Sequence, residues 1–223
     1  MINLSVIITS LNENLDRLNK TIQTIYETSD VDVEIIVVDD CSDNPILNLQ
    51  YNVKLIRNKY RLGCAASRHI GATIASGEYI LFTDAHMIFH KNWYSEWKST
   101  LNKIDFTTAV CGTCVGLDEK HDNLLQSCGS YTGARLSLFE KSENQILEGK
   151  WIKEKDGDLY KISCMMGAIY FINKEYFFKL RGLSDLMMWG SDEPCLALKI
   201  LQSGGQMILS KKIIAGHFFR NTA

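Results

Sequence analysis

Apolar residues along the 223-residue chain fall into short continuous runs and into longer stretches with spacings of three and four. Continuous runs are typical of strands buried on both faces of a sheet, and the wider spacings are typical of amphipathic helices. The run 4–9 predicts a strand, and the spacing that follows predicts a helix capped by Asn14. The run 34–38 predicts a second strand, so strand, helix and strand follow one another over about 35 residues, as in a βαβ unit.

The same alternation continues along the rest of the chain. It predicts further strands at 53–57, 79–83, 110–115, 165–172, 207–209 and 212–215, and helices at 63–76, 174–180 and 191–204. The stretch 118–161 has no clear period and stays unassigned. Because the chain has only two prolines and no Ser/Gly-rich linker, residues 1–223 are expected to form one α/β domain. Its central sheet should be mostly parallel and flanked by helices.

Three of the predicted strands end in polar residues. Asn12-Glu13 follow the first strand, Asp39-Asp40 follow the second, and Asp84-Ala85-His86 follow the run 79–83. The carboxyl ends of parallel strands lie along one edge of a sheet, where open α/β proteins bind their ligands. These polar groups are therefore expected to converge on one crevice.

Asp84 and His86 are the first candidate metal ligands. Two residues apart in extended backbone, their side chains point to the same side of the chain. A carboxylate oxygen with an imidazole nitrogen suits a divalent cation of the Mn²⁺ type. A solvated Asp at a strand end beside a half-buried His explains the tripeptide equally well, so the residues alone leave both interpretations open.

Composition narrows the class of protein. A net charge of −2 and a pI near 6.2 argue against general binding to nucleic acid. The seven cysteines form no framework, and one C-x-x-C (Cys111, Cys114) without a partner pair does not indicate structural zinc. No apolar run is long enough for a membrane span, and the N-terminus lacks a signal-peptide pattern. We therefore expect a soluble protein of the reducing cytoplasm.

Six ordered stretches resemble one enzyme family. They read E-I-I-V-V-D-D-C-S, R-L-G-C-A-A-S-R-H-I-G-A, F-T-D-A-H, M-M-G-A-I-Y-F-I-N-K-E-Y-F, W-G-S-D-E-P-C-L-A-L-K-I-L-Q-S-G-G and A-G-H-F-F-R. Together they resemble nucleotide-sugar glycosyltransferases of the GT-A fold, and most closely the catalytic domain of the polypeptide N-acetylgalactosaminyltransferases. The resemblance covers nearly the whole chain and implies a GT-A domain over residues 1–223.

The resemblance implies a set of binding residues. Asp84, His86 and His217 match the family's three Mn²⁺ ligands, and Mg²⁺ is the alternative cation. Asp40 matches the position that reads the uracil edge, and Gly167-Ala168 match a Gly-Gly that passes against the donor sugar. The implied nucleotide-sugar site comprises Thr9, Asn12, Glu13, Asp39, Asp40, Arg61, Gly63, Arg68, Ala85, Gly167 and Ala168.

The acidic pair departs from the family pattern. Where the family has W-G-G-E-N, this chain has Trp189-Gly190-Ser191-Asp192-Glu193. Related inverting GT-A enzymes have a carboxylate at the position of Glu193, which acts as general base on the acceptor hydroxyl. We therefore expect Glu193, Asp192 and Trp189 to form the catalytic group, with inversion favoured. Two acids that begin a helix are also what its dipole favours, and this structural explanation stays open.

The resulting functional hypothesis is a metal-dependent glycosyltransferase. It should transfer a sugar from a UDP-sugar to a hydroxyl of an unidentified acceptor, which is a glycan, a peptide or a modified base. One alternative is an enzyme specific for modified nucleic-acid bases, and another is a non-catalytic nucleotide-sugar-binding domain. The sequence leaves the sugar, the acceptor and the oligomeric state open.

Overall fold

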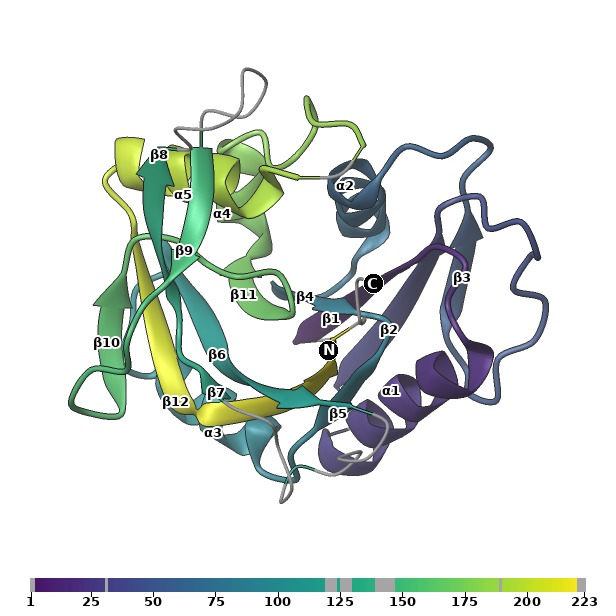
Figure 1. The fold of residues 1–223 in the computed structure, drawn as a ribbon, viewed down its shortest axis with the longest axis horizontal. Coiled ribbons are helices and arrows are strands. Elements are labelled where there is room, and N and C mark those ends of the chain that lie inside the picture. The colour runs from purple at the N-terminus through teal and green to yellow at the C-terminus, as the bar shows by residue number, and fades with distance from the viewer. Residues whose placement is uncertain are drawn as a thin grey trace.

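A computed structural model describes residues 3–30, 32–118, 124, 130–138, 147–188 and 190–219. Within them, a large mixed sheet has the strand order β10-β12-β6-β11-β4-β1-β2-β3, with β5 paired to β12 and β7 paired to β6. Strands β8 and β9 form a separate two-stranded sheet. Figure 1 shows helices on both sides of the large sheet, which confirms the predicted α/β architecture.

The N-terminal half is the predicted parallel part of the sheet. Its elements are β1 (Leu4–Ser10), α1 (Leu15–Thr28), β2 (Val33–Asp39), β3 (Lys54–Arg57), α2 (Cys64–Ile74) and β4 (Tyr79–Asp84). Strands β2 and β4 both pair in parallel with β1, which places Ser10 beside Asp39 and Thr9 beside Asp84. The polar ends of these strands therefore meet at one edge, as the sequence predicted.

The second half is mixed in direction. Strand β11 runs antiparallel to both β4 and β6, while β12 runs parallel to β6. The elements are β5 (Met87–Phe89), α3 (Trp93–Leu101), β6 (Thr108–Leu117), β7 (Ser130–Tyr131), β8 (Ala134–Leu138), β9 (Leu147–Trp151), β10 (Leu159–Ile162), β11 (Ile169–Asn173), α4 (Lys174–Lys179), α5 (Asp192–Gln202) and β12 (Gln206–Phe218). Parallel pairing therefore does not extend through the whole sheet.

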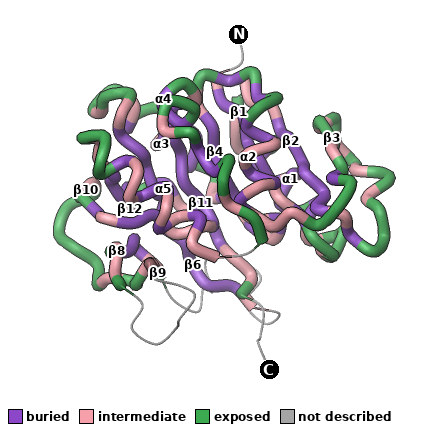
Figure 2. The backbone as a smooth tube through the Cα atoms, turned by 90° about the horizontal axis from the view of Figure 1, so that it is seen from above, coloured by how far each residue is buried: buried purple, intermediate pink, exposed green. Residues whose placement is uncertain are grey.

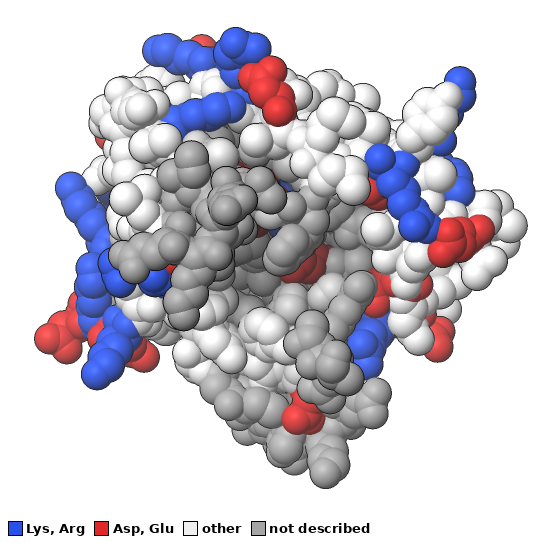
Figure 3. All heavy atoms as spheres, turned by 45° about the horizontal axis from the view of Figure 1, so that its top comes forward, with Lys and Arg blue, Asp and Glu red and all other residues white. Residues whose placement is uncertain are grey.

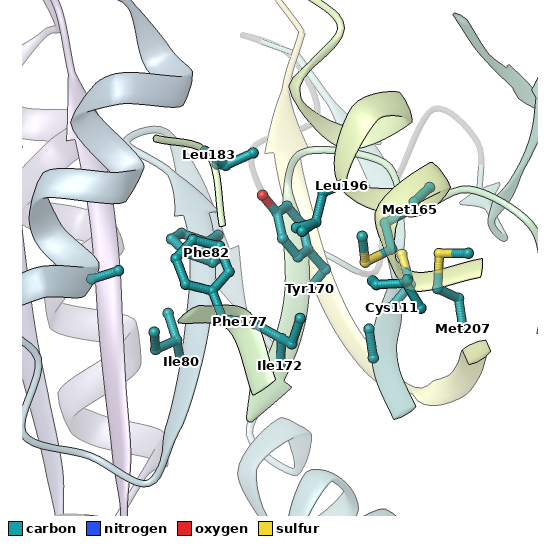
Figure 4. Packing of buried hydrophobic residues seen from close by; sticks show 14 of the residues in the cluster. Ile80, Phe82, Cys111, Met165, Tyr170, Ile172, Phe177, Leu183, Leu196 and Met207 are labelled. Carbon is teal, nitrogen blue, oxygen red and sulfur yellow. The ribbon is translucent and has the colours of Figure 1, made fainter. Parts of the chain in front are cut away.

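The core consists of two apolar layers, one on each face of the sheet. Alternate residues of a strand enter opposite layers, so Ile7 packs in one layer and Ile8 in the other. The first layer, drawn in Figure 4, includes Phe82 and Phe177, whose ring centroids lie 5.3 Å apart. Figure 2 shows the central strands β1, β2, β4 and β11 as deeply buried, whereas the edge strand β3 is mostly exposed. The strands whose polar ends gather at one edge are therefore anchored in the core.

Two sequence predictions need correction, and several elements were not predicted. The two short strands at 207–209 and 212–215 are one strand, β12, which a register shift between Ser210 and Ile214 bends. The strand expected from 165 begins only at Ile169, and Gly167 lies in the turn before it. The unassigned stretch 118–161 contains β7 to β9 and all but the last residue of β10, and β5 and α3 gave no recognised pattern. None of the described helices has the length and apolar composition needed to cross a membrane.

Candidate active site and metal centre

The candidate metal ligands come from two distant parts of the chain. Asp84 ends β4 and His86 lies in the turn to β5, while His217 is near the end of β12. Strand β12 pairs antiparallel with β5, placing His217 opposite Met87, and Phe218 N donates to the His86 carbonyl at 3.1 Å. One ligand atom from each of Asp84, His86 and His217 lies within 4.8 Å of the others.

The donor set fits a divalent cation. Burial acts to raise the pKa of Asp84, but the hydrogen bond with His217 and the positive charge of Arg68 lower it to about 2. Asp84 is therefore an ionised ligand at neutral pH. His217 Nε2 lies 3.1 Å from Asp84 Oδ2, and its buried Nδ1 has no hydrogen-bond partner among the described residues. One carboxylate oxygen and two imidazole nitrogens suit Mn²⁺.

Glu13 orients one of these ligands. Its Oε2 lies 2.6 Å from His86 Nδ1, and only 6% of its side chain is exposed. With a carboxylate that only accepts at this position, the His86 tautomer that completes the contact carries its proton on Nδ1 and keeps the Nε2 lone pair for a metal. Glu13, which the sequence assigned to the nucleotide-sugar site, therefore acts on the metal centre through His86.

Loss of this carboxylate should weaken metal binding. We expect Glu13→Ala to lower Mn²⁺ affinity about 10–100-fold, as is typical when a metal-bound histidine loses its partner. Glu13→Gln keeps a neutral acceptor and should lose less. Calorimetric titration with Mn²⁺ measures the affinity, and nitrogen shifts of the His86 ring report its tautomer. Unchanged affinity and tautomer in Glu13→Ala would exclude the orienting role.

A cavity of about 420 Å³ lies on one side of Asp84. Two apolar side chains, Leu11 and Met188, contribute to its walls. The predicted residues that line it are Thr9, Glu13, Asp40, Arg61, Gly63, Asp84, Ala85 and His86. Asn12 and Asp39 are not among its lining residues, and the structure gives both a role in the surrounding loops.

Asn12 and Asp39 hold the loops around this cavity. The Asn12 side chain accepts from Asp43 N and donates to Asp43 Oδ2, both at 2.8 Å. Asp39 is fully buried, accepts from Ser42 N at 3.0 Å and pairs with Arg57. Asn12 therefore joins the loop after β1 to the loop after β2. Asp39 joins that second loop to the end of β3.

Asp40 lies at the cavity with most of its carboxylate already bonded. Its oxygens accept from Leu62 N, Gly63 N and Asn58 Nδ2, each at 2.8 Å. Burial acts to raise its pKa, but these donors lower it below the ordinary value, so Asp40 is ionised. Recognition of uracil by Asp40 stays a prediction.

One of the residues that donate to Asp40 must be glycine. Gly63 has φ +90°, and a Cβ there would lie 1.9 Å from the Met188 carbonyl oxygen.

A second cavity of about 410 Å³ lies on the other side of Asp84. The predicted residues that line it are Arg68, Asp84, Gly167, Ala168, Asp192, Glu193 and His217. Asp84 and Cys64 line both cavities, so the two form adjoining halves of one site. Figure 3 shows Asp and Glu atoms in the hollow of this face, while Lys and Arg gather mostly at its margins.

Arg68 connects the metal centre to the acidic pair. Its side chain, 2% exposed, contacts Asp192 at 2.6 Å and Asp84 at 3.2 Å and also pairs with Glu193. Arg68 is therefore not a surface charge. Arg61, in contrast, is partly exposed and pairs with Asp43.

Three carboxylates around one guanidinium leave excess negative charge. Burial, and to a smaller extent the neighbouring charge of Asp192, raises the pKa of Glu193 to about 8, although Arg68 acts against this shift. The Glu193 carboxyl lies against Gly167, where an added Cβ would be 2.2 Å from Oε1. A glycine is therefore required at position 167 for the Glu193 carboxyl to approach the backbone so closely. The raised pKa makes Glu193 a candidate for proton transfer near neutral pH. Trp189 lies outside the described residues.

The residues that sequence reasoning missed at this site are on the β8–β9 hairpin. Glu148, Gly149 and Trp151 line the second cavity, yet all come from the stretch that no period assigned. A single tryptophan in the lysine-rich segment 150–155 gave no signal of its position. Phe219 also lines this cavity and lay within the last motif of the resemblance without a role.

Comparison with known proteins agrees with this geometry. The model of "Glycosyl transferase family 2" matches residues 5–178. N-acetylgalactosaminyltransferase 7 of Drosophila melanogaster is 30% identical over 97% of this chain and 39% of its own length, and its human counterpart is 27% identical over 97% and 36%. A crystal structure of GalNAc-T7 with UDP, GalNAc and Mn²⁺ superimposes with a TM-score of 0.81 at 24% identity, covering 98% of this chain and 44% of that one.

The extent of these matches defines what is shared. The chain spans about two fifths of the length of the curated relatives it matches, and the structural likeness establishes a common GT-A fold. The family model, in contrast, extends from β1 into α4 and includes Asp84 and His86. Because it matches more than half of the residues, the chain belongs to glycosyl transferase family 2.

Proposed function

We propose that the protein is a metal-dependent glycosyltransferase that transfers a sugar from a UDP-sugar to a hydroxyl group. The observation that supports this best is the adjacency of the metal centre and the acidic pair. Arg68 contacts Asp84 on one side and Asp192 and Glu193 on the other, at the boundary of two cavities. In this proposal, the cation therefore binds beside carboxyl groups that accept a proton.

Each cavity is assigned to a different part of the substrates. The 420 Å³ cavity, with Asp40, Arg61 and Gly63, is assigned to the nucleotide, and Asp40 to an N–H of uracil. The 410 Å³ cavity, with Gly167 and Ala168, is assigned to the donor sugar and the acceptor. Asp84, His86 and His217 would hold the cation, which supplies charge stabilisation for the departing diphosphate.

The chemistry of this chain's own residues favours inversion. Glu193, at the start of α5 and facing the second cavity, takes the proton of the acceptor hydroxyl in this proposal. Asp192, 5% exposed, keeps the guanidinium of Arg68 in place and so holds Glu193 against Gly167. Trp189 stays part of the proposed catalytic group because it precedes this pair in the sequence.

The proposed cellular location is the reducing cytoplasm. The six cysteines that the structure describes are all free thiols, as expected in a compartment that keeps thiols reduced. The acceptor in this proposal carries a hydroxyl group and is a glycan, a peptide or a modified base.

A single substitution tests the proposed function. His217→Ala removes one of three metal ligands, so Mn²⁺ affinity and Mn²⁺-dependent UDP affinity should fall together, by at least the roughly 10–100-fold typical of a lost outer-shell partner. Isothermal calorimetry measures both. His90→Ala is the matched control, since His90 lies outside the metal group. Unchanged UDP affinity in His217→Ala would refute the three-ligand site.

Donor turnover gives the second half of the test. With Mn²⁺ and a panel of nucleotide sugars but no acceptor, a transferase is expected to hydrolyse its own donor slowly. Uridine sugars should be consumed in preference to guanosine sugars. Equal consumption of both would contradict the role of Asp40, and consumption of neither with intact UDP binding would identify a binding domain.

A further inference from the structure

The second cavity has an aromatic part that the proposed chemistry does not use. Trp151 of β9 and Phe219 after β12 line it, and each is 41% exposed. Tyr131 of β7 lies between them, with ring centroids 4.7 Å from Trp151 and 5.0 Å from Phe219. Three elements distant in sequence therefore build one aromatic cluster.

This cluster is continuous with the metal centre. The ring of Phe219 lies 4.4 Å from that of His217, which in turn lies 4.7 Å from His86. A molecule stacked on Trp151 or Phe219 would thus occupy the same cavity as Glu193 and Asp84. The exposed faces of large aromatic rings in a cavity are typical of a binding surface for a flat apolar face.

The polar lining of the cavity consists mostly of hydrogen-bond acceptors. Asp84, Glu148, Asp192 and Glu193 contribute carboxyl groups, and Arg68 is the one Lys or Arg among the described lining residues. The Arg68 guanidinium already donates to three of these acids. Glu148 also pairs with Lys150 at 2.7 Å. The lining therefore favours a ligand that supplies donors and brings no negative charge.

We propose that the acceptor is a neutral sugar, with one pyranose ring stacked on Trp151. This rests on the proposed function for its chemistry, but the recognition follows from the cavity. A pyranose has a flat C–H face for an aromatic ring and hydroxyl donors around its edge for carboxylates. A peptide backbone has as many carbonyl acceptors as N–H donors, and a nucleic acid brings phosphate charge. Both therefore match the lining less well.

Binding can be measured without turnover. The indole N–H signals of the ¹⁵N-labelled protein are recorded with and without UDP and Mg²⁺, and the Trp151 signal is assigned by Trp151→Phe. The probes are methyl glucoside, methyl galactoside and methyl mannoside, compared with glucose 6-phosphate, a neutral Ser/Thr hexapeptide and a single-stranded DNA oligonucleotide. At least one methyl hexoside should shift the Trp151 signal, and the other three classes should not.

Two substitutions locate the binding surface. Trp151→Ala should weaken hexoside binding by roughly tenfold, as expected for a lost aromatic stacking partner, while Mn²⁺-dependent UDP affinity stays unchanged. Phe106→Ala is the matched control, because Phe106 is 49% exposed and lies outside both described cavities. Trp151→Phe should retain part of the affinity.

The outcomes separate this inference from the proposed function. A response to none of the hexosides, a stronger response to peptide or oligonucleotide, or unchanged hexoside binding in Trp151→Ala would each overturn the sugar-acceptor assignment. The affinity for UDP, measured by calorimetry on the same sample, tests the proposed function independently. Hexoside binding without UDP binding would leave the acceptor site standing and refute the donor assignment, and UDP binding without hexoside binding would do the reverse.

Discussion

Replacement of Arg68 by methionine should lower the free energy of unfolding by about 3–5 kcal/mol, as is typical when one partner of a buried ion pair is removed. The guanidinium is 2% exposed and faces Asp84, Asp192 and Glu193. Without it, three carboxyl groups would share one poorly solvated space. Urea denaturation followed by circular dichroism measures the loss.

Arg61→Ala is the control for this experiment. Arg61 also pairs with an aspartate, but both side chains of the Arg61–Asp43 pair are substantially exposed, so its loss should change stability by less than about 1 kcal/mol. In the Arg68→Met background, Asp192→Asn with Glu193→Gln should restore part of the stability, since neutral groups no longer repel. A loss below about 1 kcal/mol in Arg68→Met would contradict the central role of this residue.

Replacement of Glu193 by glutamine should lower turnover by about 10²–10⁴-fold and leave Mn²⁺-dependent UDP binding intact. Glutamine preserves the shape of the side chain but cannot accept a proton. Steady-state kinetics with a UDP-sugar and an acceptor give the turnover, and proton NMR of the product gives its anomeric configuration. We expect the configuration to be inverted relative to the donor.

The pH dependence supplies an independent check on Glu193. Only the ionised carboxylate acts as a base, and burial together with Asp192 raises its pKa to about 8. Turnover of the unmodified protein should therefore rise as the pH approaches 8 and level off above it. This rise with pH should be absent in Glu193→Gln. Asp192→Asn should act mainly on KM, because Asp192 positions Arg68. A retained configuration, with Glu193→Gln near full activity, would leave Glu193 as a helix-start residue.

Local patterns of the sequence predicted the N-terminal half of the fold well. Continuous apolar runs produced β1, β2 and β4 close to their observed bounds, because strands buried on both faces leave few other residue choices. The parallel connections then required their polar carboxyl ends to meet, as Asp40 and Asp84 do beside one cavity. The pattern was less informative beyond β4, where the sheet changes direction at β11 and short strands form β7 to β10.

Family resemblance supplied what periodicity could not at the metal centre. The spacing of Asp84 and His86 indicated two ligands on one side of a strand, since side chains two residues apart share a face. His217 lies 133 residues after Asp84, and only the motif around it suggested a role. The pairing of β12 with β5 is the physical reason that it joins the other two.

The sequence alone determined the α/β class and the strand-end edge of the sheet and indicated the first two candidate metal ligands, because each depends on short-range order along one element. Tertiary structure decided that Arg68 is buried among three acids, that Glu13 faces His86 and that Trp151 lies in the same cavity as Glu193. These contacts join residues far apart in the chain. Their burial raises or lowers pKa values and selects ligands through charges and cavity shape that no local pattern encodes.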